Sequence, residues 1–247
     1  MKIGICNVGV GSSHVNGTRR LKESLDHFGV DWKQFFWVDK YPDGCPTHKQ
    51  SPYGFKAYAM QEAFKAGMEI VIWLDSSMWL RNGNVSGIIS QVERDGYYFP
   101  NSGYSCGQWC SDNILRAMGV TRTDDLHDAS TSPMCMAGFT FLDLRQPRVR
   151  EFYEEYQFWC KKDNGILLQG KHVNDGSVSS DSRVTGFRHD QSVASLLIKK
   201  YGFKVTNSHE NFFMYYPYKE YVGNKWKDVK VKADLLESIT FFAQGCL

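Results

Sequence analysis

A run of five apolar residues, Ile70 to Leu74, ends abruptly at Asp75, Ser76 and Ser77. Such a run predicts a strand that is buried on both faces of a sheet. Ligands of open α/β sheets bind at the carboxyl edge of the strands, so we expect Asp75 and Ser77 to face a crevice there. On an extended backbone these two residues share one side, and their oxygens could hold a hard cation and, through it, a pyrophosphate. The alternative is that both side chains only cap the next helix or turn.

The length and charge of the chain favour one large α/β domain. With 247 residues the chain can bury a sizeable core, and we expect a single domain over residues 1–247. Its nucleotide-binding half would be residues 1–100, and residues 101–247 would form the acceptor-side half. The 29 basic and 27 acidic residues leave a net charge of +2 without a long basic block. This composition argues against a nucleic-acid groove.

Cysteine usage and hydropathy indicate the compartment. Seven cysteines form an odd, scattered set, which suits a reducing environment better than a disulfide scaffold. Cys106 and Cys110 are the only close pair, and structural thiols explain them better than a zinc site. The chain has no apolar run long enough to span a membrane, and Met1 to Cys6 match a strand rather than a signal peptide. We therefore expect a soluble, cytoplasmic protein.

Strand and helix patterns alternate along the first 80 residues. Apolar periodicity predicts strands at 2–6, 35–38 and 70–74, a glycine-rich turn at 7–13, and helices at 17–28 and 53–66. This order predicts right-handed crossovers and a mainly parallel central sheet flanked by helices. The rest of the chain predicts helices at 84–93, 112–118, 147–161 and 189–200, strands at 97–99, 136–143 and 203–206, and a mobile loop at 164–185.

Three short motifs follow one another in a specific order. The strand that ends at Asp75 comes first, a small-residue step at Ala137 and Gly138 lies in a later strand, and Asp190 with Gln191 opens a helix. In this order and spacing the chain resembles a GT-A-fold glycosyltransferase over roughly residues 2–210. The resemblance implies a Rossmann-type domain that is metal-dependent, with Mn²⁺ or Mg²⁺ as cofactor. It would move a sugar from a nucleotide-diphosphate donor, a UDP-sugar being favoured, to a hydroxyl of a glycan, a protein or a modified base.

The resemblance also implies a role for individual residues. Asp190 would be the catalytic carboxylate, which deprotonates the acceptor hydroxyl or stabilises an oxocarbenium-like centre. The acceptor would lie against Ala137 and Gly138, where small side chains leave room. The metal ligands would be Asp75, Ser77 and His209, although the family usually has a second carboxylate where this chain has Ser77. The donor would contact Asn7, Val8, Gly9, Lys56, Asp75, Ser76, Ser77 and Gln191.

Structural alternatives to these roles stay open at this stage. Asp190 could only cap its helix, Lys56 could lie on a solvated helix face, and His209 could be a surface residue of a polar turn. Arg188 could neutralise a phosphate or form a surface ion pair. Asp112 and three other aspartates lie in a loop-rich region where an acceptor-side base could also be found: Asp124, Asp125 and Asp128.

Two other classes of protein compete with a glycosyltransferase. A nucleotidyltransferase also presents acidic residues at a strand end, but it normally has a phosphate loop with lysine, and residues 7–13 contain no lysine or arginine. A non-catalytic carbohydrate-binding protein on the same fold is favoured by Ser77, because that residue weakens the metal motif. Metal-linked binding of a nucleotide sugar would distinguish the enzyme from both.

Overall fold

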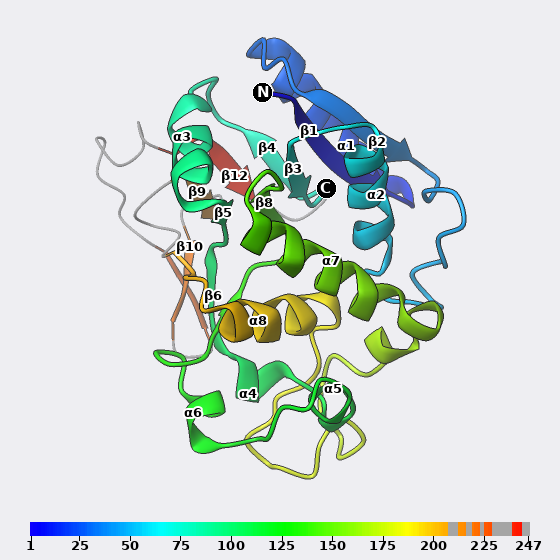
Figure 1. Cartoon of the computed structure of the whole chain (residues 1–247), viewed down its shortest axis with the longest axis vertical. Coiled ribbons are helices and arrows are strands. Elements are labelled where there is room, and N and C mark those ends of the chain that lie inside the picture. The colour runs from blue at the N-terminus through cyan, green and yellow to red at the C-terminus, as the bar shows by residue number, and fades with distance from the viewer. Residues whose placement is uncertain (207–211, 216–218, 223–224, 229–238, 244–247) are drawn as a thin grey trace.

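A computed structural model of the protein describes residues 1–206, 212–215, 219–222, 225–228 and 239–243. Its centre is a five-stranded sheet of order β2–β1–β3–β8–β5 (Figure 1). The strands are β1 (Ile3–Gly9), β2 (Lys33–Val38), β3 (Ile70–Leu74), β5 (Tyr97–Tyr98) and β8 (Phe139–Asp143). Strand β1 pairs in parallel with β2 and β3, whereas β8 is antiparallel to both β3 and β5. The predicted α/β class is therefore confirmed, and the mainly parallel sheet only for its β2–β1–β3 half.

Helices cover both faces of this sheet (Figure 1). The longer ones are α1 (Ser12–His27), α2 (Phe55–Lys65), α3 (Ser86–Asp95), α7 (Pro147–Lys161) and α8 (Asp190–Tyr201). The shorter ones are α4 (Cys106–Trp109), α5 (Asp112–Ala117), α6 (Asp124–His127) and the 3-10 helix η1 (Lys162–Leu168). Among the described helices, none is long and apolar enough to cross a membrane.

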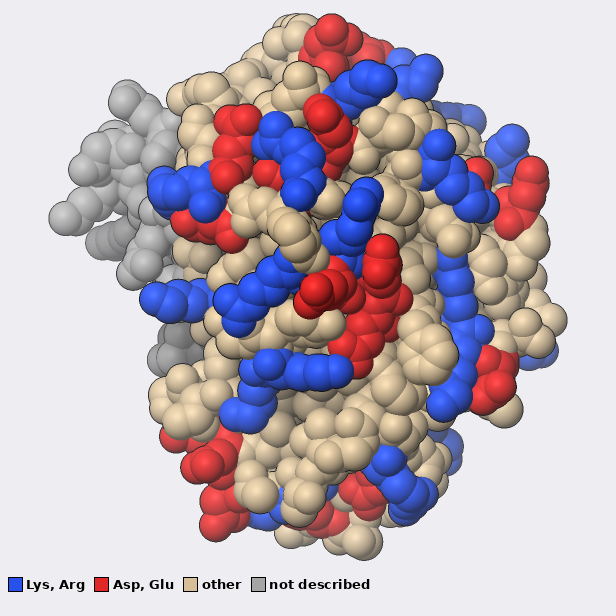
Figure 2. Space-filling model, in the orientation of Figure 1, with Lys and Arg blue, Asp and Glu red and all other residues tan. Residues whose placement is uncertain are grey.

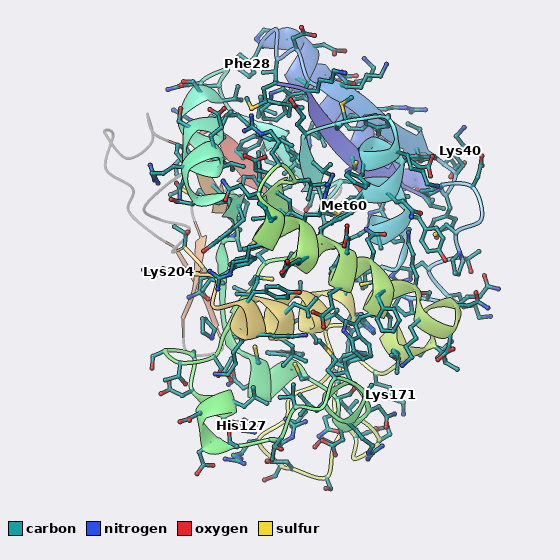
Figure 3. All side chains as sticks on the ribbon, viewed as in Figure 1. Phe28, Lys40, Met60, His127, Lys171 and Lys204 are labelled. Atoms are coloured by element: carbon teal, nitrogen blue, oxygen red, sulfur yellow. The ribbon has the colours of Figure 1, made fainter. Side chains whose placement is uncertain are left out.

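Strand β3 is buried on both faces, as its continuous apolar run predicts. Ile70, Ile72 and Leu74 pack into one hydrophobic cluster with residues of α1 and α3. Val71 and Trp73 point to the other side and pack with residues of α2, α7 and α8. Figure 3 shows Met60 of α2 in this interior layer. Because side chains alternate between the two faces of a strand, Trp73 lies on the α2 face of the sheet, close to the C-terminal end of β3.

A second sheet begins where β3 ends. Its order is β11–β10–β9–β12–β4. The strands are β4 (Met78–Leu80), β9 (Phe213–Tyr215), β10 (Lys219–Val222), β11 (Lys225–Asp228) and β12 (Phe241–Ala243). A separate two-stranded sheet joins β6 (Asn101–Ser105) and β7 (Pro133–Cys135). Phe241 of β12 packs against Phe139 of β8, so the C-terminal strands close one side of the main core.

Three local predictions need correction. Residues 203–206 form no strand, and only Thr206 makes a single bridge to Pro100. The expected glycine-rich turn at 7–13 is mostly regular structure, because β1 continues to Gly9 and α1 begins at Ser12. The loop at 164–185 is anchored to the core by buried apolar side chains, namely Leu168, Val178 and Val184.

Candidate active site

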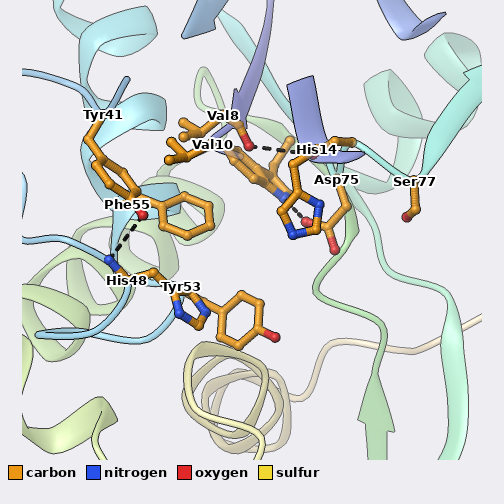
Figure 4. A pocket seen from close by; sticks show the side chains of 11 residues that line it. Val8, Val10, His14, Tyr41, His48, Tyr53, Phe55, Asp75 and Ser77 are labelled. Carbon is orange, nitrogen blue, oxygen red and sulfur yellow. Dashed lines mark hydrogen bonds between the residues drawn. The ribbon is translucent and has the colours of Figure 1, made fainter. Parts of the chain in front are cut away.

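Asp75 lies where two cavities meet at the carboxyl end of β3. The first cavity, of about 430 Å³, is mostly aromatic and includes Tyr41, Tyr53 and Phe55 (Figure 4). The second cavity, of about 210 Å³, is mostly polar and includes Arg188 and residues of the α8 N-terminus. Asp75, Ser77 and Tyr53 line both. A ligand with an aromatic end and a polar end could therefore span the two cavities across Asp75.

The chain turns sharply at residues 75–78. The Met78 amide donates a hydrogen bond to the Asp75 carbonyl at 2.9 Å. The expectation that residues 75 and 77 share one side of an extended backbone is therefore wrong, although both line the two cavities. Helix α1 holds the turn in place through Gly17, because a Cβ there would lie 2.1 Å from the Ser76 carbonyl oxygen.

Lys56 links the two carboxylates of the site. Its Nζ lies 3.2 Å from Asp75 Oδ1, 3.2 Å from Asp190 Oδ2 and 3.1 Å from the Ala137 carbonyl oxygen. The side chains of Lys56 and Asp190 are only 4% and 3% exposed. Burial lowers the pKa of Lys56, but the two carboxylates outweigh it and hold that pKa above its ordinary value. The buried ammonium therefore stays charged.

Asp75 is held by the strand that carries it and by the neighbouring strand end. The Trp73 indole Nε1 donates to Asp75 Oδ1 at 2.7 Å, and the Asp75 amide donates to the Gly138 carbonyl at 2.8 Å. The other carboxylate oxygen, Oδ2, lies over Gly138, where a Cβ would approach it to 2.5 Å. Glycine at position 138 thus gives the Asp75 carboxylate the space it occupies.

Asp190 opens α8 directly after a strained residue. His189 has φ of 50° and ψ of −119°, a backbone conformation that is costly for a non-glycine residue and that concentrates at functional sites. Its Nδ1 donates to the Leu168 carbonyl at 2.6 Å, and burial lowers the pKa of His189 to about 4. Burial raises the pKa of Asp190 to about 6, against the opposing charge of Lys56. A carboxylate with this pKa is mostly ionised at neutral pH and can still accept a proton.

Most of the predicted site residues come together here. The second cavity collects Lys56, Asp75, Ser77, Gly138, Asp190 and Gln191. The first cavity includes Val8 and Ser76. Ala137 contributes its carbonyl to Lys56, and Gln191 Nε2 donates to the Cys135 carbonyl at 2.8 Å.

Two N-terminal donor contacts have structural roles instead. Asn7 is fully buried, its Nδ2 donates to the Leu74 carbonyl at 2.6 Å, and its Oδ1 accepts a hydrogen bond from Thr18. Gly9 is packed against α1, where a Cβ would lie 2.1 Å from Thr18 Oγ1. His209 lies outside the described residues.

Sequence reasoning missed the residues that arrive from loops. Tyr41, His48 and Tyr53 come from the long loop between β2 and α2, and His172 comes from the loop after η1. Tyr53 has φ of 61°, so the loop turns tightly just before α2 and brings its ring within 5.5 Å of His189. The available signal was an aromatic content of 15%, which is most concentrated at residues 211–218 and so did not indicate the loop residues at 41 and 53.

The described residues offer a divalent metal only part of a coordination shell. Within the described part of the chain, no group of three or more His, Cys, Asp or Glu side chains is placed to hold a metal ion. At the site, Asp75 Oδ1 already contacts Trp73 and Lys56, which leaves Oδ2 and the Ser77 hydroxyl. Divalent ions that bind phosphates often combine one or two protein oxygens with water and phosphate oxygens. The residues therefore fit a metal only in company with a bound diphosphate.

The fold described above is similar to that of two solved glycosyltransferases. Similarity in structure extends to a glycosyltransferase involved in the glycosylation of the major capsid of PBCV-1, with a TM-score of 0.52, 12% identity, and coverage of 98% of this chain and 92% of that one. It extends also to the WbbM bifunctional glycosyltransferase, with a TM-score of 0.51, 9% identity, and coverage of 98% of this chain and 45% of that one. The chain therefore spans less than half the length of WbbM.

Sequence comparisons add no closer relative. No protein-family model matches the chain, and no curated protein sequence matches it. At 9–12% identity, the structural similarity establishes the fold, which confirms the resemblance to glycosyltransferases at the level of architecture. What the chain does with this fold depends on its own site residues.

Proposed function

We propose that the protein is a glycosyltransferase that moves a sugar from a nucleotide-diphosphate donor to a hydroxyl acceptor. The observation that carries the proposal is the cluster of Lys56, Asp75 and Asp190 at the junction of an aromatic and a polar cavity. The aromatic cavity suits a nucleoside, because aromatic rings stack on a base, and its volume lies in the range of small-molecule sites. The polar cavity suits the sugar and the acceptor hydroxyl.

Asp190 is the group best suited to the chemical step. Its pKa of about 6 lets it act at neutral pH as a base toward the acceptor hydroxyl, or as an anion that stabilises an oxocarbenium-like centre. Lys56 keeps the Asp190 carboxylate and the Asp75 carboxylate at a fixed separation, since its ammonium contacts both. Tyr53 and His189 form an aromatic wall beside this cluster and help to exclude water from it.

The metal and the donor nucleotide remain part of the proposal. Asp75 Oδ2 and the Ser77 hydroxyl would contribute to holding Mn²⁺ or Mg²⁺, with His209 as the predicted third ligand. Such an ion, when bound, neutralises charge on a departing diphosphate. A UDP-sugar is the favoured donor.

The two competing functions fit the site less well. A nucleotidyltransferase must bind a triphosphate, yet the first cavity is lined by no lysine or arginine from the described residues. A passive carbohydrate-binding protein does not need a buried carboxylate with a raised pKa next to a strained histidine, and both features concentrate at catalytic sites. Figure 2 shows Lys and Arg mixed with Asp and Glu on the visible face, so this face offers no uniformly basic surface for a nucleic-acid acceptor.

The test is the substitution Asp75→Ala. Binding of UDP and UDP-glucose is measured by calorimetry with and without Mn²⁺, and donor hydrolysis is followed with UDP-, GDP- and dTDP-sugars. We expect the wild type to bind one donor more tightly with Mn²⁺, and D75A to lose at least about tenfold in that metal-linked affinity, because a charged ligand is removed.

A matched control is available for this substitution. Asp95→Ala removes an aspartate whose side chain is also 36% exposed, but which pairs with Arg94 on the surface of α3. D95A is expected to bind the donor as the wild type does. Equal donor affinity in D75A and D95A, with the fold intact by circular dichroism, would overturn the assignment of Asp75.

A further inference from the structure

Arg188 is a cation of the second cavity that has no acidic partner among the described residues. It lies two residues before Asp190 and lines the same cavity. Its guanidinium stacks on the Trp109 indole, with Cζ 4.1 Å from the ring centroid, and the Tyr104 ring lies 5.8 Å away. Its Nε is buried without a hydrogen-bond partner. A buried and unpaired guanidinium donor is costly, so such a group is normally found with an anion.

The other titratable side chains that line the cavity do not neutralise the Arg188 charge. Lys56 takes both nearby carboxylates, those of Asp75 and Asp190. His172 also lines the cavity, and burial together with the charge of Arg188 lowers its pKa, so it is neutral near pH 7. The guanidinium is thus the one charge of the described cavity lining that no described side chain compensates.

The geometry of the guanidinium favours a planar anion. The contact with the Trp109 ring, 4.1 Å from Cζ to the ring centroid, restricts the position of the guanidinium. An arginine held in this way matches the paired oxygens of a carboxylate or phosphate and can bind them through two parallel hydrogen bonds. Asp190 does not serve as this anion, because its described ion pair is with Lys56.

We propose that Arg188 binds a carboxylate or phosphate carried by the carbohydrate in the second cavity, and that the protein therefore selects an acidic sugar over its neutral counterpart. This proposal rests on the proposed function, because it places a sugar in that cavity. Trp109 acts as a positioning residue that holds the guanidinium. The acidic group can belong to the donor sugar or to the acceptor, and the two sources are separated by experiment.

The experiment compares acidic and neutral members of two ligand pairs. The donor pair is UDP-glucuronate and UDP-glucose. The acceptor pair is methyl glucuronide and methyl glucoside, with glucose 1-phosphate as the phosphate probe, added to protein saturated with UDP. Affinities are measured by calorimetry. We expect the acidic member of one pair to bind about tenfold more tightly, as charged hydrogen bonds allow.

Variants assign this preference to Arg188. Arg188→Gln should remove the preference, and Arg188→Lys should keep part of it, because lysine retains the charge but not the paired donors. Arg148→Gln is the matched control, since Arg148 also stacks on an aromatic ring, that of Phe203, outside both cavities. R148Q should keep the full preference. Melting temperatures of all variants confirm that each is folded.

Several outcomes would overturn the proposal. These are equal binding of both members in each pair, an unchanged preference in R188Q, or a loss in R188Q that is just as large for UDP alone. The last result would assign Arg188 to the diphosphate. Failure of the proposed function is a separate result, namely that the wild type binds neither UDP nor any UDP-sugar. In that case the acceptor pair is measured without UDP, and an Arg188-dependent preference for methyl glucuronide still supports the assignment of Arg188.

Discussion

Replacing Lys56 with methionine removes the buried cation and leaves the carboxylates of Asp75 and Asp190 without it. Asp190 is only 3% exposed, so it relieves the repulsion by taking up a proton. In the wild type, burial raises the Asp190 pKa from 3.8 to about 6. Because the folded-state pKa of Asp190 is above the unfolded value, the contribution of Asp190 to the free energy of unfolding depends on pH. It is fully present at low pH and is lost as the pH rises through the folded-state pKa.

The magnitude follows from these two pKa values. In the wild type, the loss of stability that comes from ionising Asp190 reaches about 3 kcal/mol. It does not grow further above the folded-state pKa of about 6. In K56M the lowering effect of Lys56 is lost, so we expect Asp190 to stay protonated at about pH 7.5, where protonating an ordinary aspartate costs about 5 kcal/mol. This charge effect therefore destabilises K56M by about 2 kcal/mol at about pH 7.5 and by almost nothing at about pH 5.5, where both proteins carry the proton.

Chemical unfolding of K56M and wild type at the two pH values measures this difference. Lys65→Met is the matched control, because Lys65 lies on the same helix and pairs with Glu62 on the surface. K65M should change the free energy of unfolding by well under about 1 kcal/mol, equally at both pH values. Other contacts of Lys56 contribute to the total, but they do not change with pH. A destabilisation of K56M that is the same at both pH values would refute the assignment of Asp190 as an ionised partner of Lys56.

Two further predictions concern neighbouring residues. Gly138→Ala places a Cβ 2.5 Å from Asp75 Oδ2 and so forces the carboxylate to move. We expect donor binding to fall as in D75A, and the double variant G138A/D75A to be no worse than D75A alone; additive losses in the double variant would contradict this. His189, whose pKa falls from 6.5 to about 4 on folding, contributes about 3 kcal/mol that is present above pH 6.5 and lost as the pH falls toward 4. His189→Asn should therefore lose less stability than the wild type between these pH values in thermal unfolding, whereas the exposed His27→Asn should behave like the wild type.

The elements that sequence predicted well are those whose signal is local. The apolar run of β3 has the same bounds in the structure, and α7 spans the predicted 147–161. The antiparallel direction of β8 was not predicted, because the hydrophobic pattern of a strand indicates which side chains are buried and not which way the strand runs. The C-terminal strands β9 to β12 were also missed, since they are only three or four residues long and depend on pairing with distant partners.

The candidate site likewise contains residues that the sequence predicted and one connection between them that it did not predict. Asp75 was predicted because it follows a buried strand, and the carboxyl edge of a sheet gathers such residues. Asp190 was predicted from the resemblance to GT-A-fold glycosyltransferases, in which such a residue opens a later helix. Their connection through Lys56 was not predicted. A lysine near the start of a helix is normally solvated, and the sequence leaves that alternative open at position 56. Only the assembled fold buries it.

The position of Lys56 explains why the site requires several parts of the fold at once. Helix α2 supplies the ammonium, the turn after β3 supplies Asp75, the segment before β8 supplies the Ala137 carbonyl, and α8 supplies Asp190. A buried lysine is tolerable only when all its acceptors are present, because an unpaired buried charge is strongly destabilising. The same contact that holds two carboxylates at the junction of the cavities therefore makes local disorder in any of these elements unfavourable. The proposed sugar transfer requires rigid placement of a carboxylate, and in this site such placement results from the burial of a single ammonium group.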